Sequence, residues 1–284
     1  MKNIDFDKVG IILRPDSPEL KGNFLKVQET LNKHNVEIFL EKNSAEMISL
    51  EGVDFDEMCQ RSSFLITIGG DGTLISTARK SLLYDIPILG IHAGRLGFLS
   101  DVSIEAFDGF FKQMLDGKFR IDERAVLEAT LNKGAKEEKR YAFNDVVLTR
   151  SSVPQMIHIE TLVDSRPFNT YYGDGVIVST PTGSTAYNLS AGGPVMFPLT
   201  NVFSLTPICP HSLTQRPVVL PGKYPIEMKT SSEKALVIFD GQDMLELGLG
   251  ESIDIKLASK MVNLIHKEDF NYFEILKNKL NWGE

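Results

Sequence analysis

The sequence predicts an α/β domain built on a doubly wound parallel sheet, followed by an antiparallel β domain. Up to about residue 120, short β-branched runs alternate with longer segments of helical period, which is the pattern of βαβ units. After about Ile121, short alternating runs follow one another with few long helical segments between them. A chain of 284 residues is long enough for two such domains.

Four apolar runs predict the strands of the first domain, at residues 8–13, 36–40, 64–68 and 86–91. Residues 19–34 place Leu20, Phe24, Val27 and Leu31 at spacings of four, three and four, which predicts an amphipathic helix. Residues 73–83 and 104–115 have the same period. Residues 1–121 are therefore predicted to form a Rossmann-like α/β domain.

Seven shorter segments predict the strands of the second domain, at residues 126–131, 141–148, 155–163, 176–179, 226–229, 236–239 and 252–257. We expect them to form an antiparallel β-sandwich over residues 122–265. Residues 269–280 return to helical period and place Phe273, Leu276 and Leu280 on one face. The C-terminal segment, residues 266–284, is expected to return to the first domain, because that face must be buried.

The composition argues against several classes of protein. Lys and Arg number 30 and Asp and Glu 38, so the net charge of −8 offers nucleic acid or anionic lipid no overall attraction. The two cysteines, Cys59 and Cys209, lie far apart, and the five histidines form no metal-ligand cluster. No apolar run approaches the roughly 20 residues of a membrane span, and the first residues do not resemble a secretory signal. We expect a cytoplasmic protein that binds neither nucleic acid nor membranes.

The first candidate motif is Gly69-Gly70-Asp71-Gly72-Thr73, where a strand runs into a helix. Glycines at such a turn let backbone N–H groups approach a phosphate, and the helix N-terminus favours anions. The motif is neither a Walker loop nor a dinucleotide fingerprint, because no Gly-Lys-Ser/Thr follows and Ile75 replaces the third glycine. A tight turn capped by Asp71 explains the pattern about equally well.

Asp71 nevertheless stands at the carboxyl end of a buried strand, where open α/β sheets bind their ligands. A carboxylate beside a phosphate can hold a divalent cation or take a proton from an attacking hydroxyl. Arg95 follows the strand at residues 86–91 and can reach a phosphate, although a solvated loop arginine is as good an explanation.

The second candidate is the hydroxyl-rich segment at residues 173–190. By composition alone, an ordinary loop that caps a helix is the more frequent explanation. A segment with many Ser and Thr hydroxyls is also suited to binding ribose and adenine, which are recognised by hydrogen bonds. The pair Asn144-Asp145 precedes an apolar run and is either a turn or an amide and a carboxylate for ribose hydroxyls.

Together these segments resemble the NAD kinase family, in its bacterial, ATP- or polyphosphate-dependent form. The resemblance is carried by the Gly69–Thr73 motif, Asn144-Asp145, residues 92–99, the run Thr-Pro-Thr-Gly-Ser-Thr-Ala-Tyr at 180–187 and Phe-Asp-Gly-Gln at 239–242. The first motif is shared with diacylglycerol and sphingosine kinase relatives and is close to a phosphofructokinase motif. The run at 180–187 is more particular to NAD kinases and therefore points to the substrate.

The resemblance implies transfer of the terminal phosphate of ATP, or of polyphosphate, to the 2′-hydroxyl of the adenosine ribose of NAD, with Asp71 as the catalytic proton acceptor. It implies a divalent cation, usually Mg²⁺, whose protein ligands it does not assign. It also implies a homodimer or homotetramer in which a neighbouring subunit completes the NAD site. The implied phosphate loop consists of Gly69, Gly70, Gly72, Thr73 and Arg95. The implied NAD-binding residues are Asp71, Gly72, Asn144, Asp145, Asp174, Thr182, Thr185, Ala186, Tyr187, Asn188, Leu189, Ser190 and Gln242.

Two positions depart from the family pattern. Tyr172 stands two residues before Asp174, where many bacterial members have a basic residue, and Ser76 stands five residues after Asp71, where some have Arg. Each change removes a potential phosphate or carboxamide contact.

Two other functions stay open at this stage. A lipid kinase can use the first motif, but the acidic balance and the lack of a basic amphipathic segment argue against it. A non-catalytic NAD(P)-binding sensor is the second alternative, and Asp71 argues against it because a pure binder needs no base.

Overall fold

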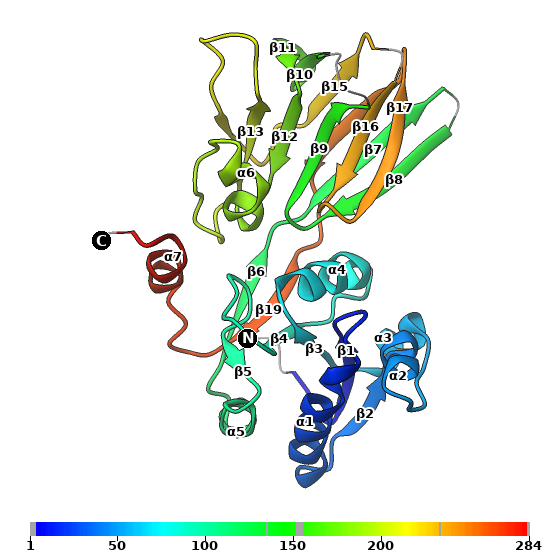
Figure 1. Ribbon diagram of the computed structural model, residues 1–284, viewed down its shortest axis with the longest axis vertical. Coiled ribbons are helices and arrows are strands. Elements are labelled where there is room, and N and C mark those ends of the chain that lie inside the picture. Colours follow the sequence, from blue (N-terminus) through cyan, green and yellow to red (C-terminus); the bar gives the residue numbers. More distant parts are fainter. Residues whose placement is uncertain (1–3, 135, 152–155, 233, 283–284) are drawn as a thin grey trace. The chain divides into compact units, whose positions relative to one another are not determined.

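The computed structural model describes residues 4–134, 136–151, 156–232 and 234–282. The chain divides into two compact units, Met1–Glu123 with Val262–Glu284, and Arg124–Met261 (Figure 1). The first unit is α/β and the second is an antiparallel β-sandwich, which confirms the predicted fold class. We find no helix among the described residues with the length and apolar character that crossing a membrane requires.

The first unit contains a seven-stranded sheet. Its order is β2 (Glu37–Leu40), β1 (Lys8–Leu13), β3 (Phe64–Gly69), β4 (Ile88–His92), β19 (Val262–His266) and β6 (Arg120–Arg124), with β5 (Val102–Ser103) also paired to β4. Strands β1 to β4 and β19 are parallel. Every residue of β3 is buried, as expected for a strand that is covered on both faces.

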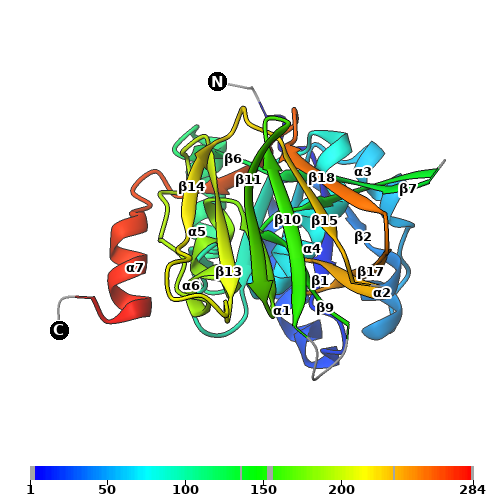
Figure 2. The same cartoon turned by 90° about the horizontal axis from the view of Figure 1, so that it is seen from above.

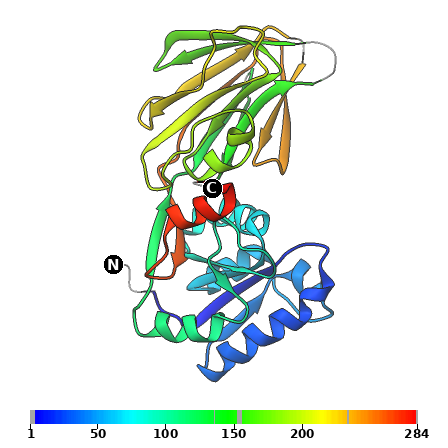
Figure 3. The same cartoon turned by 60° about the vertical axis from the view of Figure 1, so that its left-hand side comes forward.

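Helices cover both faces of this sheet (Figure 3). On one face, α1 (Lys21–Lys33) and α5 (Phe107–Leu115) share a core with alternate strand residues such as Ile66. On the other face lie α3 (Phe55–Arg61) and α4 (Asp71–Ser81), and a Cβ on Gly10 of β1 would lie 2.7 Å from Met58 of α3. A short helix, α2 (Lys42–Met47), follows β2. This is the doubly wound arrangement that the alternating pattern predicts.

The apolar residues predicted to be buried are all buried in one helix but not in another. Leu20, Phe24, Val27 and Leu31 are all buried, as predicted for the segment that contains α1. The predicted face of α7 (Tyr272–Leu280) is confirmed for Leu276 but wrong for Phe273, which is 67% exposed, and Tyr272 and Ile275 are the other buried residues. The buried residues follow the i, i+3, i+4 spacing, and their stripe is rotated around the helix from the predicted one toward Tyr272 and Ile275. Helix α7 belongs to the first unit.

The second unit consists of two six-stranded antiparallel sheets around one core. One sheet has the order β11 (Arg166–Gly173), β10 (Ile157–Val163), β15 (Ile226–Thr230), β18 (Ser252–Leu257), β7 (Leu127–Lys133) and β8 (Lys136–Ala142). The other has the order β14 (Val218–Pro221), β13 (Val202–Ile208), β12 (Gly175–Ser179), β9 (Asp145–Arg150), β16 (Lys234–Phe239) and β17 (Asp243–Gly248). Figure 2 shows β10, β15 and β18 side by side. Apolar residues from both sheets, such as Leu131 and Leu148, meet in the core.

The strand predicted at residues 141–148 is two strands in the structure. β8 ends at Ala142 and β9 begins at Asp145, so the chain leaves the ladder at Phe143 and Asn144. The physical reason is that polar groups from two other segments bind the backbone there, as described below. Gln155, the first residue of the strand predicted at 155–163, lies outside the described residues.

Candidate functional site

The glycine-rich motif forms the junction between β3 and α4. β3 ends at Gly69 and α4 begins at Asp71, while the carbonyl of Gly70 accepts the N–H of Thr73 at 3.1 Å. A Cβ on Gly69 would lie 2.7 Å from Thr73 Oγ1, so this position requires glycine for close packing. A Cβ on Gly70 or Gly72 would meet no atom within 4 Å. The turn therefore leaves room for a ligand at the helix N-terminus.

The carboxylate of Asp71 is held by the segment that follows β4. The N–H of Phe98 donates to Asp71 Oδ2 at 2.7 Å, and the N–H of Leu99 donates to Oδ1 at 3.3 Å. A Cβ on Gly97 would lie 2.0 Å from Asp71 Oδ1, so the chain can approach the carboxylate only with glycine at that position. Each oxygen keeps a further acceptor site, and the oriented carboxylate can therefore accept a proton or a hydrogen bond from a ligand.

Two more predicted phosphate ligands lie in this unit. Thr73 is 6% exposed, and its Oγ1 has no hydrogen-bond partner within the described part of the chain. A buried hydroxyl in the first turn of α4 is a donor that an anion at the helix N-terminus can satisfy. Arg95 is exposed in the segment between β4 and Gly97.

In the second unit, Asp240 fixes the turn that carries Asn144 and Asp145. Its Oδ1 accepts the N–H groups of Asn144 at 2.7 Å and Asp145 at 3.2 Å, and its Oδ2 accepts that of Phe143 at 3.0 Å. Asp240 has a φ of 53° in the turn between β16 and β17. The sequence assigned a role to Gln242 and missed Asp240, although Asp240 lies in the same resembling segment at 239–242.

Thr180 holds the same turn through other atoms. Its Oγ1 donates to the carbonyl of Phe143 at 2.7 Å and accepts the N–H of Gly183 at 3.0 Å. Its N–H donates to the carbonyl of Asn144 at 2.8 Å, and a Cβ on Gly183 would lie 2.2 Å from that same oxygen. The Thr-Pro-Thr-Gly sequence is thus required for close backbone packing on residues 143–145, and this packing interrupts the predicted strand.

Two buried polar side-chain atoms at this turn have no hydrogen-bond partner among the described residues. Asn144 Oδ1 and Thr182 Oγ1 are buried, and neither has a partner among the described residues. Asp145 is 4% exposed, and its burial together with the charge of Asp240 raises the pKa of its carboxyl to about 7. Leaving a buried polar atom unpaired costs about 1–3 kcal/mol, so a group of such atoms marks a place for a polar ligand.

Asp174 and Tyr187 lie in the same region as this turn. Burial raises the pKa of the Tyr187 phenol, with smaller contributions from the charges of Cys209, Asp174 and Asp145. Asp174 Oδ1 lies 3.1 Å from Arg150 Nε. Tyr187 itself is exposed at the start of α6 (Tyr187–Ser190), where its ring is open to a ligand.

Asn188 has a structural role in the same loop. Its Nδ2 donates to the carbonyls of Ser184 and Pro194, and its Oδ1 accepts the hydroxyls of Ser204 and Thr206. The side chain therefore ties the loop to β13. Thr185 and Ala186 are half-buried, Leu189 is half-buried and Ser190 is exposed, while the N–H of Gln242 donates to the carbonyl of Phe239. Which of these residues contact NAD stays a prediction.

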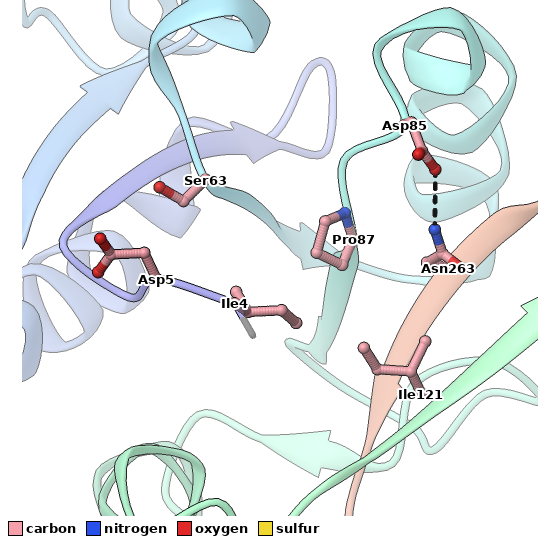
Figure 4. Close-up of a pocket in the computed structure, with 7 residues that line it drawn as sticks. All are labelled: Ile4, Asp5, Ser63, Asp85, Pro87, Ile121 and Asn263. Atoms are coloured by element: carbon pink, nitrogen blue, oxygen red, sulfur yellow. Dashed lines mark hydrogen bonds between the residues drawn. The ribbon is translucent and has the colours of Figure 1, made fainter. Parts of the chain in front are cut away.

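The first unit contains a cavity of about 320 Å³, whose lining residues are drawn in Figure 4. The cavity lies at the other end of the strands from the glycine-rich turn. Ser63, Pro87 and Asn263 lie at the beginnings of β3, β4 and β19, whereas Gly69 is at the end of β3. Asn263 Nδ2 donates to Asp85 Oδ1 at 3.1 Å. The remaining lining residues are Ile4, Asp5 and Ile121.

Comparison with known proteins identifies relatives over nearly the whole chain. Family models described as the ATP-NAD kinase N-terminal and C-terminal domains match residues 9–119 and 143–267. The NAD kinase of Sulfurimonas denitrificans is 64% identical over 284 residues, which is 100% of both chains. The NAD kinase of Wolinella succinogenes is 46% identical, over 98% of this chain and 96% of that one.

Two solved structures have the same fold. Yeast NADH kinase complexed with NADH has a TM-score of 0.90 and 26% identity, over 98% of this chain and 89% of that chain. An NAD kinase from Archaeoglobus fulgidus in complex with ATP has a TM-score of 0.80 and 26% identity, over 96% of this chain and 98% of that chain.

Proposed function

The chain belongs to the ATP-NAD kinase family, and we propose that it transfers the terminal phosphate of ATP to the 2′-hydroxyl of the adenosine ribose of NAD, giving NADP. The family predicted from the motifs is confirmed, and the lipid kinase and the non-catalytic sensor have no support among the relatives. The observation that carries the mechanism is the Asp71 carboxylate, held by two N–H groups beside an open glycine turn.

In the proposed reaction, the ribose oxygen attacks the terminal phosphorus of ATP and its proton passes to Asp71. The bond to ADP breaks as the new P–O bond forms. A ribose hydroxyl is a poor nucleophile, and a positioned base contributes about 10²- to 10⁴-fold to the rate. Phe98 and Leu99 hold the base in one orientation, which reduces the entropy that must be lost at the reacting centre.

The phosphates of ATP would be bound by the start of α4. The backbone at Gly70 and Gly72, the hydroxyl of Thr73 and the helix N-terminus offer donors to an anion, and Arg95 would add a positive charge. Polyphosphate presents the same phosphate oxygens, so it is a second candidate donor for this site.

The NAD end would be recognised in the second unit. Asn144 and Asp145 offer an amide and a carboxyl to ribose hydroxyls, while Thr182 and Tyr187 offer a hydroxyl and an exposed ring to the adenine end. Asp174, together with Gly72, Thr185, Ala186, Leu189, Ser190 and Gln242, completes the proposed set of NAD-binding residues. Asn188, whose side chain is buried and fully hydrogen-bonded within the unit, would contribute by holding this loop in place.

A divalent cation such as Mg²⁺ can bind at these residues only if the substrate supplies most of its ligands. Within the described ranges no group of three or more His, Cys, Asp or Glu side chains is placed to hold a metal ion. Mg²⁺ commonly binds through substrate phosphates, waters and one or two carboxylates, and Asp71 is the carboxylate beside the phosphate turn. When bound with ATP, it would neutralise charge on the phosphates.

The proposal includes a cytoplasmic enzyme that forms a homodimer or homotetramer, in which a neighbouring subunit completes the NAD site. The support for both statements is the resemblance to the family. Size-exclusion chromatography with light scattering measures the oligomeric state directly.

The test is an assay of the purified chain with Mg²⁺ and NAD, run in parallel with ATP and with polyphosphate, and read out by a dehydrogenase specific for NADP. We expect NADP with at least one donor. If neither donor yields NADP, the proposed function is wrong. Parallel reactions with diacylglycerol test a lipid acceptor, and thermal stabilisation by NADP without turnover would indicate a sensor.

A further inference from the structure

The C-terminal segment contacts the same stretch of chain that holds Asp71. Two residues after Leu99, Asp101 Oδ1 lies 3.1 Å from His266 Nδ1, and Asp101 Oδ2 accepts the N–H of Lys267 at 3.0 Å. The side chains of His266 and Asp101 are 0% and 10% exposed. This contact joins the end of β19 to the start of β5.

His266 is fixed by groups on several sides. Its ring stacks on that of Phe270, with 4.0 Å between the centroids, and its Nε2 lies 3.8 Å from Asp122 Oδ2. Arg120 donates to both carboxylate oxygens of Asp122 and to the carbonyl of Phe270. The imidazole therefore has little freedom to turn, and it presents a fixed nitrogen to Asp101.

Burial alone would raise the pKa of the Asp101 carboxyl. The hydrogen bond and charge of His266, together with the N–H of Lys267, outweigh this effect and hold the pKa below its usual value. The contact is thus made by an ionised carboxylate, and such charge-assisted hydrogen bonds are about twice as strong as neutral ones.

The stretch from Gly97 to Asp101 is short and packed along its length. Ser100 is buried against β4, where a Cβ on Gly90 would lie 3.0 Å from Ser100 Cβ. Lys279 of α7 places Nζ 5.9 Å from the centroid of the Phe98 ring. Only the backbone dihedral angles of Leu99 and Ser100 separate Asp101 from the N–H of Leu99, and because Ser100 is packed against β4, we expect a displacement of Asp101 to move that N–H.

We propose that His266 and Asp101 are positioning residues for phosphoryl transfer, whose contact places the N–H donors of Phe98 and Leu99 and through them orients the Asp71 carboxylate. The proposal rests on the proposed role of Asp71 as proton acceptor. A displacement of about 1 Å at a reacting group can cost about 10²-fold in rate, so a contact that only positions these donors has a measurable effect.

The first experiment compares His266→Leu, His266→Asn and Asn263→Ala by steady-state kinetics. Leu removes the donor to Asp101, whereas the Nδ2 of Asn occupies nearly the place of the imidazole Nδ1. Asn263→Ala is the matched control, because it removes a hydrogen bond from the same strand at the cavity of Figure 4. We expect His266→Leu to lower kcat about 10- to 100-fold with KM values changed less than about threefold. His266→Asn should recover most of kcat, and Asn263→Ala should stay within about twofold of the original chain.

The second experiment repeats His266→Leu in an Asp71→Asn background, measured by single-turnover formation of NADP. If His266 acts through Asp71, the second substitution has less than about a twofold further effect on the residual rate. An equal loss in both backgrounds would mean a general structural role and would overturn the proposal. Asp101→Asn, which keeps the side-chain shape, is tested in the same two backgrounds, so the proposal stays falsifiable if His266→Leu does not fold.

The outcomes separate this inference from the proposed function. A chain that forms no NADP contradicts the proposed function, and an active chain that is unaffected by Asp71→Asn contradicts the role of Asp71. If Asp71→Asn loses activity while folded His266→Leu and Asp101→Asn keep full kcat, only the positioning role is wrong.

Discussion

The carboxylate of Asp240 accepts the main-chain N–H of Asn144 at 2.7 Å, and it also binds the N–H groups on either side of it. One side chain thereby satisfies three backbone donors at the junction between β8 and β9. The turn keeps its shape before any ligand arrives, which lowers the entropy cost of binding.

Asp240→Asn should weaken both folding and NAD binding. The amide keeps one acceptor oxygen but turns an NH₂ group toward an N–H, so we expect a loss of about 1–3 kcal/mol in unfolding free energy. NAD affinity should fall at least about tenfold, as measured by calorimetry. Asp243→Asn is the control, since that carboxylate accepts the N–H of Met244 in the same hairpin. Unchanged NAD affinity in Asp240→Asn would contradict the role of this turn.

Asp71→Asn should abolish most of the NADP-forming activity while NAD still binds. The amide has nearly the same size but cannot accept the ribose proton, so kcat should fall about 10²- to 10⁴-fold. NAD affinity, measured by thermal stabilisation, should change only a few-fold. Retention of more than a tenth of kcat would show that another group takes the proton.

Gly97→Ala should lower kcat by displacing the Asp71 carboxylate. The new Cβ would lie 2.0 Å from Asp71 Oδ1, so the carboxylate or the segment must move. Gly94→Ala is a matched control in the same segment, because a Cβ there would meet no atom within 4 Å. We expect a loss of about tenfold or more in the first variant and less than about twofold in the second. Equal kinetics in both variants would argue against a fixed carboxylate.

Thr180→Val should destabilise the Asn144 turn, whereas Thr180→Ser should not. Valine has the shape of threonine but removes the hydroxyl that binds the carbonyl of Phe143 and the N–H of Gly183. We expect a loss of about 1–3 kcal/mol in unfolding free energy and a higher KM for NAD, with serine close to the original chain. Chemical denaturation and initial rates measure the two effects.

The pH dependence of stability should reveal the buried carboxyl of Asp145. Its pKa is raised from 3.8 to about 7, so between these values the folded state binds more protons than the unfolded state. Its contribution to the unfolding free energy therefore falls as pH rises from about 4 to 7, by up to about 1.4 kcal/mol per pH unit, and is constant above 7.

Asp145→Asn removes this titration. Its stability relative to the original chain should increase between about pH 4 and 7 and then level off. Asp164→Asn, in the exposed turn between β10 and β11, is the control for replacing an aspartate elsewhere in this unit. Denaturation at a series of pH values measures both curves, and parallel curves for Asp145→Asn and the original chain would contradict the raised pKa.

The spacing of apolar residues within a segment predicts whether that segment is a helix or a strand and which of its residues are buried. The stripe that begins at Leu20 and the buried run at residues 64–68 both have their expected structure, because periodicity records how a segment is covered. The same reasoning could not find β19, which follows the strands of the second unit along the chain but belongs to the first unit, where it pairs with β4. Its partner residues in β4 are 176 positions earlier in the chain, as in the pair Leu264 and Ile88, and no short window of sequence contains that information.

The candidate site also contains some residues that the local sequence predicts and others that it does not. The position of Asp71 between a strand and a helix follows from the sequence around it. Asp240 could not be found in this way, because its partners at residues 143–145 are 95 to 97 positions away. The break in the strand predicted at 141–148 has the same origin, since alternation alone does not show that side chains elsewhere will bind that backbone.

The first unit is formed by two separate segments of the chain, so its sheet can be completed only after the second segment has been synthesised. Strand β19 inserts between β4 and β6, yet it is translated only after all of residues 124–261. Until then, the edges of β4 and β6 that β19 will pair with are open, and such edges are prone to wrong pairing. A nascent chain therefore contains all the strands of its β-sandwich before the unit that carries Asp71 can close its sheet, which requires residues 262–266.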